Sequence, residues 1–244
     1  MLCLDITLPS PEENLALEEC LLDWVEEHPL QEYVRFWESS SYFVVLGQSN
    51  KIQEEVYLEA CQKETIPILR RTSGGGAVLQ GPGCLNYALF LPLARYPQLT
   101  TISSTNTTIL TLHKEALSPF LPHIEIQGIS DLAFHGKKFS GNAQKRKKNG
   151  ILYHGTFLTH FDNEKMETLL RFPSKYPAYR QDRSHKKFVT NIPMSPSDIK
   201  SVLKTIWNTL YEINRLSDID SLLSSRVTQL VQEKYSRKEW NFKY

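Results

Sequence analysis

The sequence predicts an α+β fold in which helices flank a mixed, mainly antiparallel sheet. Two observations support this prediction: strand-like runs follow one another across short turns, and helical patterns occur at both ends and in the middle of the chain. With 244 residues, of which 41% are hydrophobic, the chain corresponds to one large domain, with or without a small appendage. We assign residues 1–244 to a single domain.

The first half of the chain begins with a strand and a helix. Ser10 can cap this helix, Pro11 suits its first turn, and the glutamates that follow lie near the positive end of the helix dipole. Two aromatic and β-branched runs then predict a hairpin. The expected elements, in order, are a strand over 2–8, a helix that ends at Pro29, a hairpin of 33–37 with 42–46, a helix over 53–63, a strand over 66–69, and strands over 77–79 and 85–91 that pair around Gly81-Pro82-Gly83.

The second half contains the clearest turn signal, Asn149-Gly150, which predicts a hairpin. Residues 172–191 show little periodicity and many basic and aromatic side chains, which predicts a long loop. A loop of this length inside a compact domain is commonly functional. The other expected elements are a helix from Asn106 or Thr107 to Leu117, strands over 137–144 and 151–158, and helices over 162–170, 195 to about 213, and 222–235.

Charge and cysteine content exclude several classes of function. The net charge of +1 gives no general attraction to nucleic acid or to a membrane surface, so we expect neither as a partner. The four cysteines lack the spacing of a zinc site, which predicts free, mostly buried thiols in a reducing compartment. Neither a signal peptide nor an apolar run of about 18 residues is visible, so we expect a cytoplasmic protein.

Three consecutive glycines, Gly74 to Gly76, separate two strand-like runs and follow Arg70 and Arg71. Glycine costs conformational entropy, so a triplet is expected where the backbone takes unusual dihedral angles or approaches a ligand closely. Consecutive N–H groups can bind an anion, and the arginines favour an anionic ligand. The alternative is a tight hairpin with two solvated arginines. The triplet matches neither the dinucleotide fingerprint nor the P-loop.

A second polar stretch covers residues 137–144. In a regular strand, side chains alternate between two faces. This alternation places Lys138, Ser140, Asn142 and Gln144 on one polar face, with Phe139, Gly141 and Ala143 on the other. Such a strand is either exposed to solvent or lines a polar pocket. A further glycine with polar neighbours follows in Tyr153-His154-Gly155-Thr156.

Five motifs occur in a distinctive order: Arg-Thr-Ser-Gly-Gly-Gly-Ala-Val, Leu-Asn-Tyr, Ser-Asp-Leu, Gly-Lys-Lys-Phe-Ser-Gly-Asn-Ala-Gln and His-Gly-Thr. As a set they closely resemble the catalytic domain of lipoate–protein ligases, within the wider biotin/lipoyl ligase and octanoyltransferase family. The resemblance extends from Leu46-Gly47-Gln48 to Glu239-Trp240-Asn241-Phe242 and implies a biotin/lipoyl ligase-like catalytic domain.

The resemblance implies a reaction in two steps. Lipoate and ATP would form lipoyl-adenylate and pyrophosphate. A lysine of an acceptor lipoyl domain, in a 2-oxoacid dehydrogenase E2 subunit or in the glycine cleavage H protein, would then attack the mixed anhydride. Mg²⁺ would be held mainly by the phosphates, without a metal site in the protein. Fixed cations and N–H dipoles suit this chemistry, because two anions must meet in the first step.

By motif position, Lys138 corresponds to the family's essential lysine, which contacts the acyl carbonyl and the adenylate phosphate. The resemblance assigns nucleotide binding to Arg71, Gly76, Ala77, Val78, Leu79, Asp131 and Lys138. It assigns the lipoyl pocket to Ser73, Gly74, Gly75, Asn86, Gly141, Asn142, Ala143, His154, Gly155 and Thr156. In the basic loop, Arg180, Arg183 and His185 are candidate phosphate or carboxylate contacts of a lid; a solvated surface loop is the alternative.

Within the family, octanoyltransferases use a thiol that lies downstream of the lysine strand. This sequence has no cysteine after Cys84, which argues against a covalent thioester. Biotin ligases have a different glycine pattern. Many members carry an accessory domain after the Trp-Asn-Phe stretch, but this sequence ends at Tyr244. The alternatives are therefore a lipoyltransferase that uses preformed lipoyl-adenylate, or a non-catalytic lipoate-binding subunit that needs a separate accessory chain.

The basic turn from Lys145 to Lys148 allows two interpretations. A solvated hairpin tip is the default. The functional interpretation is docking of an acidic acceptor domain, which would weaken as salt is added.

Overall fold

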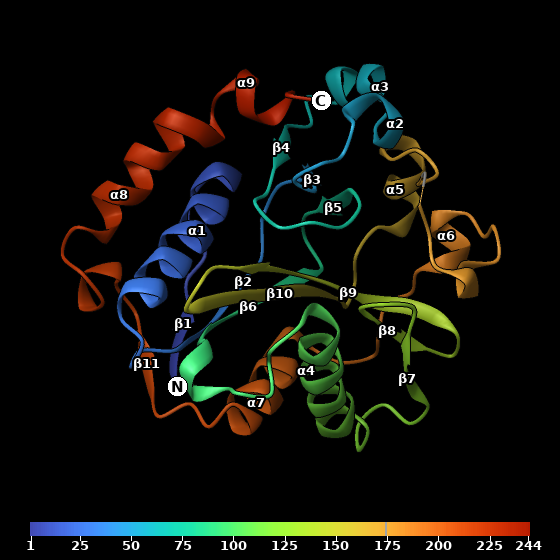
Figure 1. The fold of residues 1–244 in the computed structure, drawn as a ribbon. Helices are drawn as coiled ribbons and strands as arrows, with labels where there is room; N and C mark the ends of the chain where they lie inside the picture. Colours follow the sequence, from blue (N-terminus) through green and yellow to red (C-terminus); the bar gives the residue numbers. More distant parts are fainter. Residues whose placement is uncertain (174) are drawn as a thin grey trace.

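Two sheets and a surrounding layer of helices make up residues 1–173 and 175–244, the part of the chain that the computed structural model describes (Figure 1). In the larger sheet, five strand pairings are antiparallel and two are parallel. The smaller sheet has one pairing of each kind. The sheets are therefore mixed and mainly antiparallel, and the predicted fold class is confirmed.

The strand order brings distant parts of the sequence together. The larger sheet has the order β11 (Tyr211–Ile213), β1 (Leu2–Asp5), β2 (Tyr33–Trp37), β6 (Cys84–Pro92), β10 (Gly150–Leu158), β9 (Lys137–Arg146), β8 (Asp131–Phe134) and β7 (Ile124–Gln127). The smaller sheet has the order β4 (Ile68–Arg70), β3 (Phe43–Leu46) and β5 (Val78–Gln80). The predicted hairpin around Asn149-Gly150 is confirmed as β9 and β10.

Helices cover both faces of the larger sheet. Helices α4 (Ile102–Leu117) and α7 (Pro196–Ile206) pack on one face; α1 (Pro11–Glu27) covers the other, and α8 (Leu223–Leu230) packs against α1 (Figure 1). The other described helices are short: α2 (Ile52–Glu55), α3 (Leu58–Lys63), α5 (Asn163–Leu169), α6 (His185–Phe188) and α9 (Lys238–Asn241). None of the helices in residues 1–173 and 175–244 combines the length and apolar character that crossing a membrane requires.

Helix α1 begins as the sequence predicts. The Ser10 hydroxyl accepts a hydrogen bond from the N–H of Glu13 at 3.2 Å, and the Glu13 carboxylate accepts one from the N–H of Ser10 at 2.9 Å. This capping box satisfies two N–H groups, and Pro11 fits the first turn because its missing N–H is not needed there. The apolar side of α1, including Leu17 and Leu21, is buried against the larger sheet.

The predicted hairpin over residues 33–46 is wrong, because β2 belongs to the larger sheet and β3 to the smaller one. Every residue of both strands is buried, so each strand is covered on both faces, which an isolated hairpin cannot provide. The predicted pairing of residues 77–79 with 85–91 is also wrong. Strand β5 pairs with β3, whereas β6 pairs with β2 and β10. The chain therefore crosses repeatedly between the two sheets.

Two predicted helices are shorter than expected. The helix expected over residues 53–63 is interrupted at Val56, whose backbone forms a bridge with Leu170. The helix expected from 195 to about 213 ends at Ile206, because the last residues of that range form β11 beside β1. In both places, backbone pairing with a distant segment outweighs local helical periodicity.

Two other helix ends also differ from the prediction. Helix α4 starts at Ile102 with Thr101 as its cap, and not at Asn106 or Thr107. The Thr101 hydroxyl accepts a hydrogen bond from the N–H of Ser104 at 3.0 Å, which makes it the better cap. Helix α8 is followed by a wider helical turn over Val231–Tyr235, so the predicted C-terminal helix is confirmed with altered geometry at its end.

His113 on α4 should make stability depend on pH. The side chain is fully buried, and its Nε2 accepts a hydrogen bond from the indole N–H of Trp207 at 2.9 Å. Burial lowers the pKa of His113 to about 3. As pH falls below about 6.5, the unfolded chain therefore binds a proton that the folded chain does not bind. We expect stability to decrease by up to about 1.4 kcal/mol per pH unit between pH 6.5 and 3 from this group.

Urea unfolding of His113→Gln at pH 7 and pH 5 would measure this contribution, because glutamine keeps an acceptor for Trp207 and does not titrate in this range. The variant should lose less stability on acidification than the wild type does. His160→Gln is the control, since it makes the same substitution at an exposed position. An unaltered pH dependence in His113→Gln would contradict the assignment.

Candidate active site

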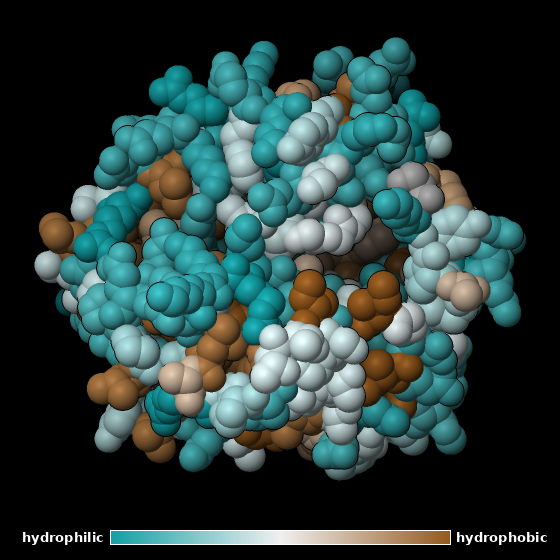
Figure 2. Space-filling model, viewed as in Figure 1, coloured by the Kyte–Doolittle hydropathy of each residue, from teal (hydrophilic) through white to brown (hydrophobic). Residues whose placement is uncertain are grey.

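A cavity of about 600 Å³ lies between the two sheets. Strands β6, β9 and β10 form its floor, and the smaller sheet with the glycine triplet forms a second wall. Residues 175–189, together with α5, close a third side. The cavity opens on the face shown in Figure 2, where hydrophobic side chains lie inside and beside the hollow. A mostly apolar lining with a few convergent polar groups is typical of a pocket for a small organic ligand.

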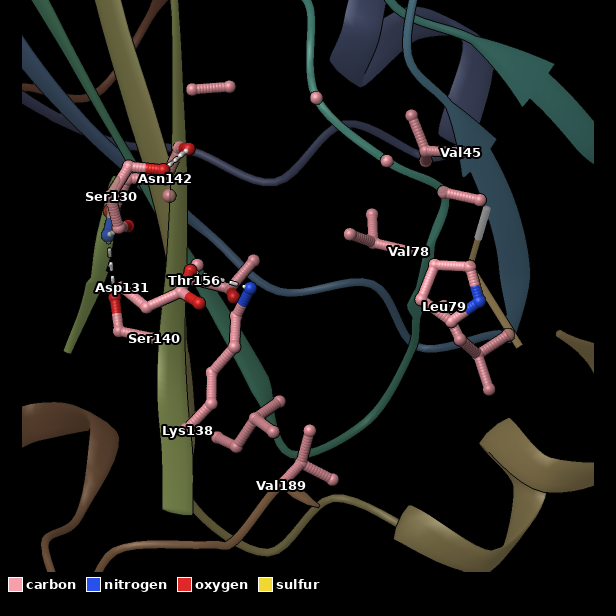
Figure 3. Close-up of a pocket in the computed structure, with 18 of the residues that line it drawn as sticks. Val45, Val78, Leu79, Ser130, Asp131, Lys138, Ser140, Asn142, Thr156 and Val189 are labelled. Carbon is pink, nitrogen blue, oxygen red and sulfur yellow. Dashed lines mark hydrogen bonds and ion pairs between the residues drawn. The ribbon is translucent and has the colours of Figure 1, made fainter. Parts of the chain in front are cut away.

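Lys138 projects into this cavity from β9 and pairs with the carboxylate of Asp131 on β8 at 2.7 Å (Figure 3). The second oxygen of Asp131 accepts a hydrogen bond from the hydroxyl of Tyr179 at 2.8 Å. A Cβ at Gly141 would lie 2.6 Å from both Cε and Nζ of Lys138. Glycine at this position therefore leaves the space that the ammonium group occupies.

A β-bulge decides which residues of β9 face the cavity. The register between β8 and β9 skips Phe139, which leaves that residue as an extra one. A bulge resets the alternation of side chains, so the predicted four-residue polar face is wrong. Lys138 lies over Gly141 on the cavity side. Asn142 lines the cavity as well, and its Oδ1 accepts a hydrogen bond from the Tyr87 hydroxyl at 2.5 Å.

The guanidinium group of Arg71 is buried behind the glycine triplet and holds it in place. It donates to the carbonyls of Gly74 at 2.6 Å, Gly76 at 2.9 Å and Val45 at 3.2 Å, and to the hydroxyl of Ser73 at 3.0 Å. Burial lowers its pKa to about 10, so the group stays charged at pH 7. A direct contact from Arg71 to a nucleotide would require some of these bonds to rearrange.

The glycine triplet also packs against Gly47, a glycine outside the triplet. Gly75 has a φ of +91°, a conformation that favours glycine. Gly47, just after β3, lies so close that a Cβ there would be 2.0 Å from the carbonyl oxygen of Gly75. The N–H of Gln48 donates to the carbonyl of Ser73 at 2.8 Å, which fastens the two segments together. Gly47 therefore lets the carbonyl of Gly75 approach closely, and this contact sets the distance between the glycine triplet and the end of β3.

A chain of buried polar side chains supports the triplet from behind. The Glu18 carboxylate accepts hydrogen bonds from His154 Nδ1 at 2.7 Å and from the Trp37 indole at 3.0 Å. His154 Nε2 forms a hydrogen bond with the Ser73 hydroxyl at 2.7 Å. Burial alone would raise the pKa of Glu18, but its pairing with His154 and the charge of Arg35 outweigh burial and lower that pKa. Sequence reasoning missed Glu18 and Trp37, which both line the cavity.

The two arginines beside the triplet have different positions. Arg70 is fully buried and donates to the carbonyls of Gly47 at 2.9 Å, Asn50 at 2.9 Å, Trp240 at 3.1 Å and Asn241 at 3.1 Å. It therefore ties α9 to β4 and does not face the cavity. Because Arg71 is buried too, the alternative of two solvated arginines is wrong.

Most residues that the sequence assigns to the site do line the cavity. They are Arg71, Gly75, Gly76, Ala77, Val78, Leu79, Asn86, Asp131, Lys138, Gly141, Asn142, Ala143, His154, Gly155, Thr156, Arg180 and His185. Ser73, Gly74 and Arg183 do not belong to this lining. Ser73 lies behind the wall between Arg71 and His154.

The basic loop over residues 172–191 contains α6 and a helical turn; position 174 lies outside the described residues. Arg180 is buried, with its guanidinium 4.8 Å from the ring of Phe188. Arg183 donates to the carbonyls of Gly136 at 3.0 Å and Tyr179 at 2.6 Å. These two cations therefore fasten the loop to itself and to the β8–β9 turn, and Tyr179 is the loop side chain that reaches Asp131.

Thiols and metal-binding side chains bear on the chemistry that this cavity can support. All four cysteines are free and buried, as predicted. Burial raises the pKa of Cys3 and Cys61 to about 11, that of Cys20 to about 12, and that of Cys84, which lines the cavity, further above its usual range. A thiol acts as a nucleophile as its thiolate, which these environments disfavour. Among residues 1–173 and 175–244, no three His, Cys, Asp or Glu side chains are grouped to bind a metal.

Comparison with known proteins gives consistent matches. Residues 10–209 match the model of the lipoyl protein ligase A/B catalytic domain. The chain is 27% identical over 238 residues to a probable lipoate-protein ligase A from Mycoplasma pneumoniae, covering 95% of this chain and 68% of that protein. It is 25% identical over 267 residues to the octanoyltransferase LipM of Halalkalibacterium halodurans, covering 96% and 95%.

Two solved structures share the fold. A bi-partite lipoate protein ligase from Thermoplasma acidophilum, described together with its E2 lipoyl domain, superposes with a TM-score of 0.80 at 23% identity and covers 98% of this chain and 95% of that one. A lipoate-protein ligase A bound with ATP has a TM-score of 0.79 at 22% identity and covers 98% and 97%.

The fold and the site together define an α+β domain in which a glycine-rich loop and a lysine-bearing strand border one cavity. With the match over residues 10–209, the chain belongs to the lipoyl protein ligase A/B catalytic domain family.

Proposed function

We propose that this chain is a lipoate–protein ligase that activates lipoate with ATP and transfers the lipoyl group to a lysine of an acceptor lipoyl domain. One observation carries the proposal: the ammonium of Lys138 and two glycines of the triplet, Gly75 and Gly76, border the same cavity of about 600 Å³. Cations and N–H dipoles on the two sides can hold a carboxylate and a phosphate together. The relative named lipoate-protein ligase A and the neighbouring structure bound with ATP support this choice.

In the first step, a lipoate carboxylate oxygen would bond to the α-phosphorus of ATP, and pyrophosphate would leave. The Lys138 ammonium would move from Asp131 toward the acyl and phosphate oxygens, where it offsets the repulsion between the two anions. In the second step, the amine of the acceptor lysine would attack the acyl carbon, lose a proton, and expel AMP. Lys138 would then stabilise the negative charge on the acyl oxygen.

Mg²⁺ would enter with the triphosphate and not through a site of its own. Both oxygens of Asp131 are engaged, one by Lys138 and the other by Tyr179. Mg²⁺ is commonly held by substrate phosphates and water, and no step above depends on the ion.

Octanoyl transfer is the second candidate, because the match to LipM covers 95% of that protein. A thioester route needs a thiolate, however, and burial raises the pKa of Cys84, the thiol in the described lining. We therefore place the ligase first. A lipoyltransferase that uses preformed lipoyl-adenylate, and a lipoate-binding subunit without activity of its own, are the further alternatives.

One set of assays on the purified chain separates these functions. With lipoate, ATP and Mg²⁺, the ligase should release pyrophosphate, and a purified E2 lipoyl domain should gain the mass of one lipoyl group. Mass gain only from preformed lipoyl-adenylate would identify a transferase. Mass gain from an octanoyl thioester without ATP would identify an octanoyltransferase, and lipoate binding without any mass gain would identify a binding subunit.

A further inference from the structure

The acceptor domain must bring its lysine to Lys138, so some surface beside the cavity has to receive it. We propose that Ile102 and Ile129, named here the apolar lip, form the docking surface for that domain. The inference rests on the proposed function and goes beyond it, because it assigns the surface that selects the protein substrate.

Exposure and position single out Ile129. Its side chain is 80% exposed, although it lines the mouth of the cavity. It lies two residues before Asp131, whose carboxylate contacts the ammonium of Lys138 at 2.7 Å. Ile102, at the start of α4, is 59% exposed. Large apolar side chains that stay exposed next to a reaction centre are typical of protein-binding surfaces.

Hydrogen bonds link the two isoleucines and fix the backbone that presents them. The Asn106 amide donates to the carbonyl of Ile129 at 3.2 Å. The Gln144 amide donates both to the Asn106 side chain at 3.0 Å and to the carbonyl of Ile102 at 3.0 Å. One pair of side chains therefore connects the start of α4 with the β7–β8 turn. This also gives Gln144 a role that its position outside the cavity lining does not suggest.

The turn that carries Ile129 is held from its other side as well. Gly128 has a φ of +59°, and a Cβ there would lie 3.0 Å from Pro177. The carbonyl of Ser130 accepts a hydrogen bond from the Asn142 amide at 2.8 Å, and its hydroxyl donates to the carbonyl of Asn142 at 2.7 Å. A rigid turn that keeps an isoleucine in solvent reduces the ordering cost of a contact with a partner.

The charge around the lip indicates the kind of partner. Residues 97–112 and 126–130, which contain the two isoleucines, include no Asp, Glu, Lys or Arg. Arg146 also contacts this surface, because its guanidinium donates to the carbonyls of Leu99 and Thr100 and to the hydroxyl of Thr105. A partner that docks on the two isoleucines therefore needs an apolar surface beside its target lysine. Because screening acts on charges, salt should leave this contact largely unchanged.

The basic hairpin tip is a poorer candidate for the same role. Lys147 lies just beyond the end of β9 and nine residues from Lys138, which corresponds to about 30 Å in an extended strand. Lys147 pairs with Asp23, and the N–H of Asn149 donates to Glu26 at 2.8 Å, so the tip is attached to the C-terminal end of α1. The tip is therefore partly engaged by contacts within the chain, whereas the two isoleucines are exposed.

The test uses Ile129→Ser and Ile102→Ser in the full chain, with a fluorescently labelled E2 lipoyl domain as the probe. We expect each substitution to weaken binding of this domain about tenfold, because a buried isoleucine contact is lost. Leu30→Ser is the matched control: Leu30 is 85% exposed and does not line the cavity, so binding should not change. Raising NaCl from 50 to 500 mM should change the wild-type affinity less than threefold.

Unchanged binding in both isoleucine variants, or an equal loss in Leu30→Ser, would overturn the proposal. A steep loss of wild-type affinity with salt would instead place the acceptor on a charged surface. Self-association of the wild type that the isoleucine variants abolish, without any effect on the lipoyl domain, would assign the lip to a second copy of this chain and also overturn it. Pyrophosphate release is measured separately. The binding assay therefore tests the docking surface, and the pyrophosphate assay tests the proposed adenylate formation, so failure of one can be told apart from failure of the other.

Discussion

Replacing Lys138 by alanine should abolish acceptor modification and leave the fold intact. Loss of one preorganised charge at a reacting oxygen lowers rates by roughly 10²–10³-fold. Here the same ammonium would serve in both steps, so the effect on kcat/KM should lie at or above the upper end of that range. The side chain is 29% exposed, and its ion pair among the described residues is with Asp131, so the substitution should change the free energy of unfolding little. Mass spectrometry of the lipoyl domain and thermal unfolding measure the two properties.

The neighbouring lysine supplies the control. Lys137 is exposed, precedes Lys138 on β9 and does not line the cavity, so Lys137→Ala should retain activity. Lys138→Arg keeps the charge but replaces a mobile ammonium by a planar group, and Gly141 leaves space fitted to the former. We expect this variant to stay strongly impaired. Full activity of Lys138→Ala would exclude the proposed role of this side chain.

The glycine triplet and the lysine strand could be predicted because their signals are local. Three glycines in a row and a polar run that ends in a hairpin are visible within short windows of sequence. The roles of Arg70 and Arg71 could not be separated in the same way. Adjacent strand residues point to opposite faces, so one of the two had to turn away from the triplet. Which one did depends on Trp240 and Asn241, about 170 residues further along the chain.

The residues that sequence reasoning missed depend on packing between distant elements. Glu18 belongs to α1 and meets His154 only because α1 lies across β10. Its signal was a single acid among the buried apolar residues of that helix, which periodicity alone treats as an exception. The bulge at Phe139 left no signal either, since it arises from the register with β8. Local patterns therefore predicted many of the residues that line the cavity, and tertiary contacts decided how those residues are arranged.

Gly47→Ala should impair catalysis although Gly47 carries no side chain and does not line the cavity. The added Cβ would lie 2.0 Å from the carbonyl oxygen of Gly75 and 3.0 Å from its carbonyl carbon. These are main-chain atoms, so relief requires the glycine triplet to move as a unit. A displacement of about 1 Å in a positioning element can lower activity by roughly 10²-fold. Steady-state kinetics with lipoate and ATP varied in turn would measure the loss.

The same methyl group in the same segment gives the matched comparison. Gly74→Ala places a Cβ where nothing lies within 4 Å, and the residue has no positive φ. If activity depends on the distance between the triplet and β3, the loss of activity in Gly74→Ala should be at least tenfold smaller than the loss in Gly47→Ala. Equal losses would mean that the triplet is sensitive to any added side chain. A loss in Gly47→Ala that follows thermal stability alone would mean that Gly47 serves the packing of β3 and not the position of the loop above it.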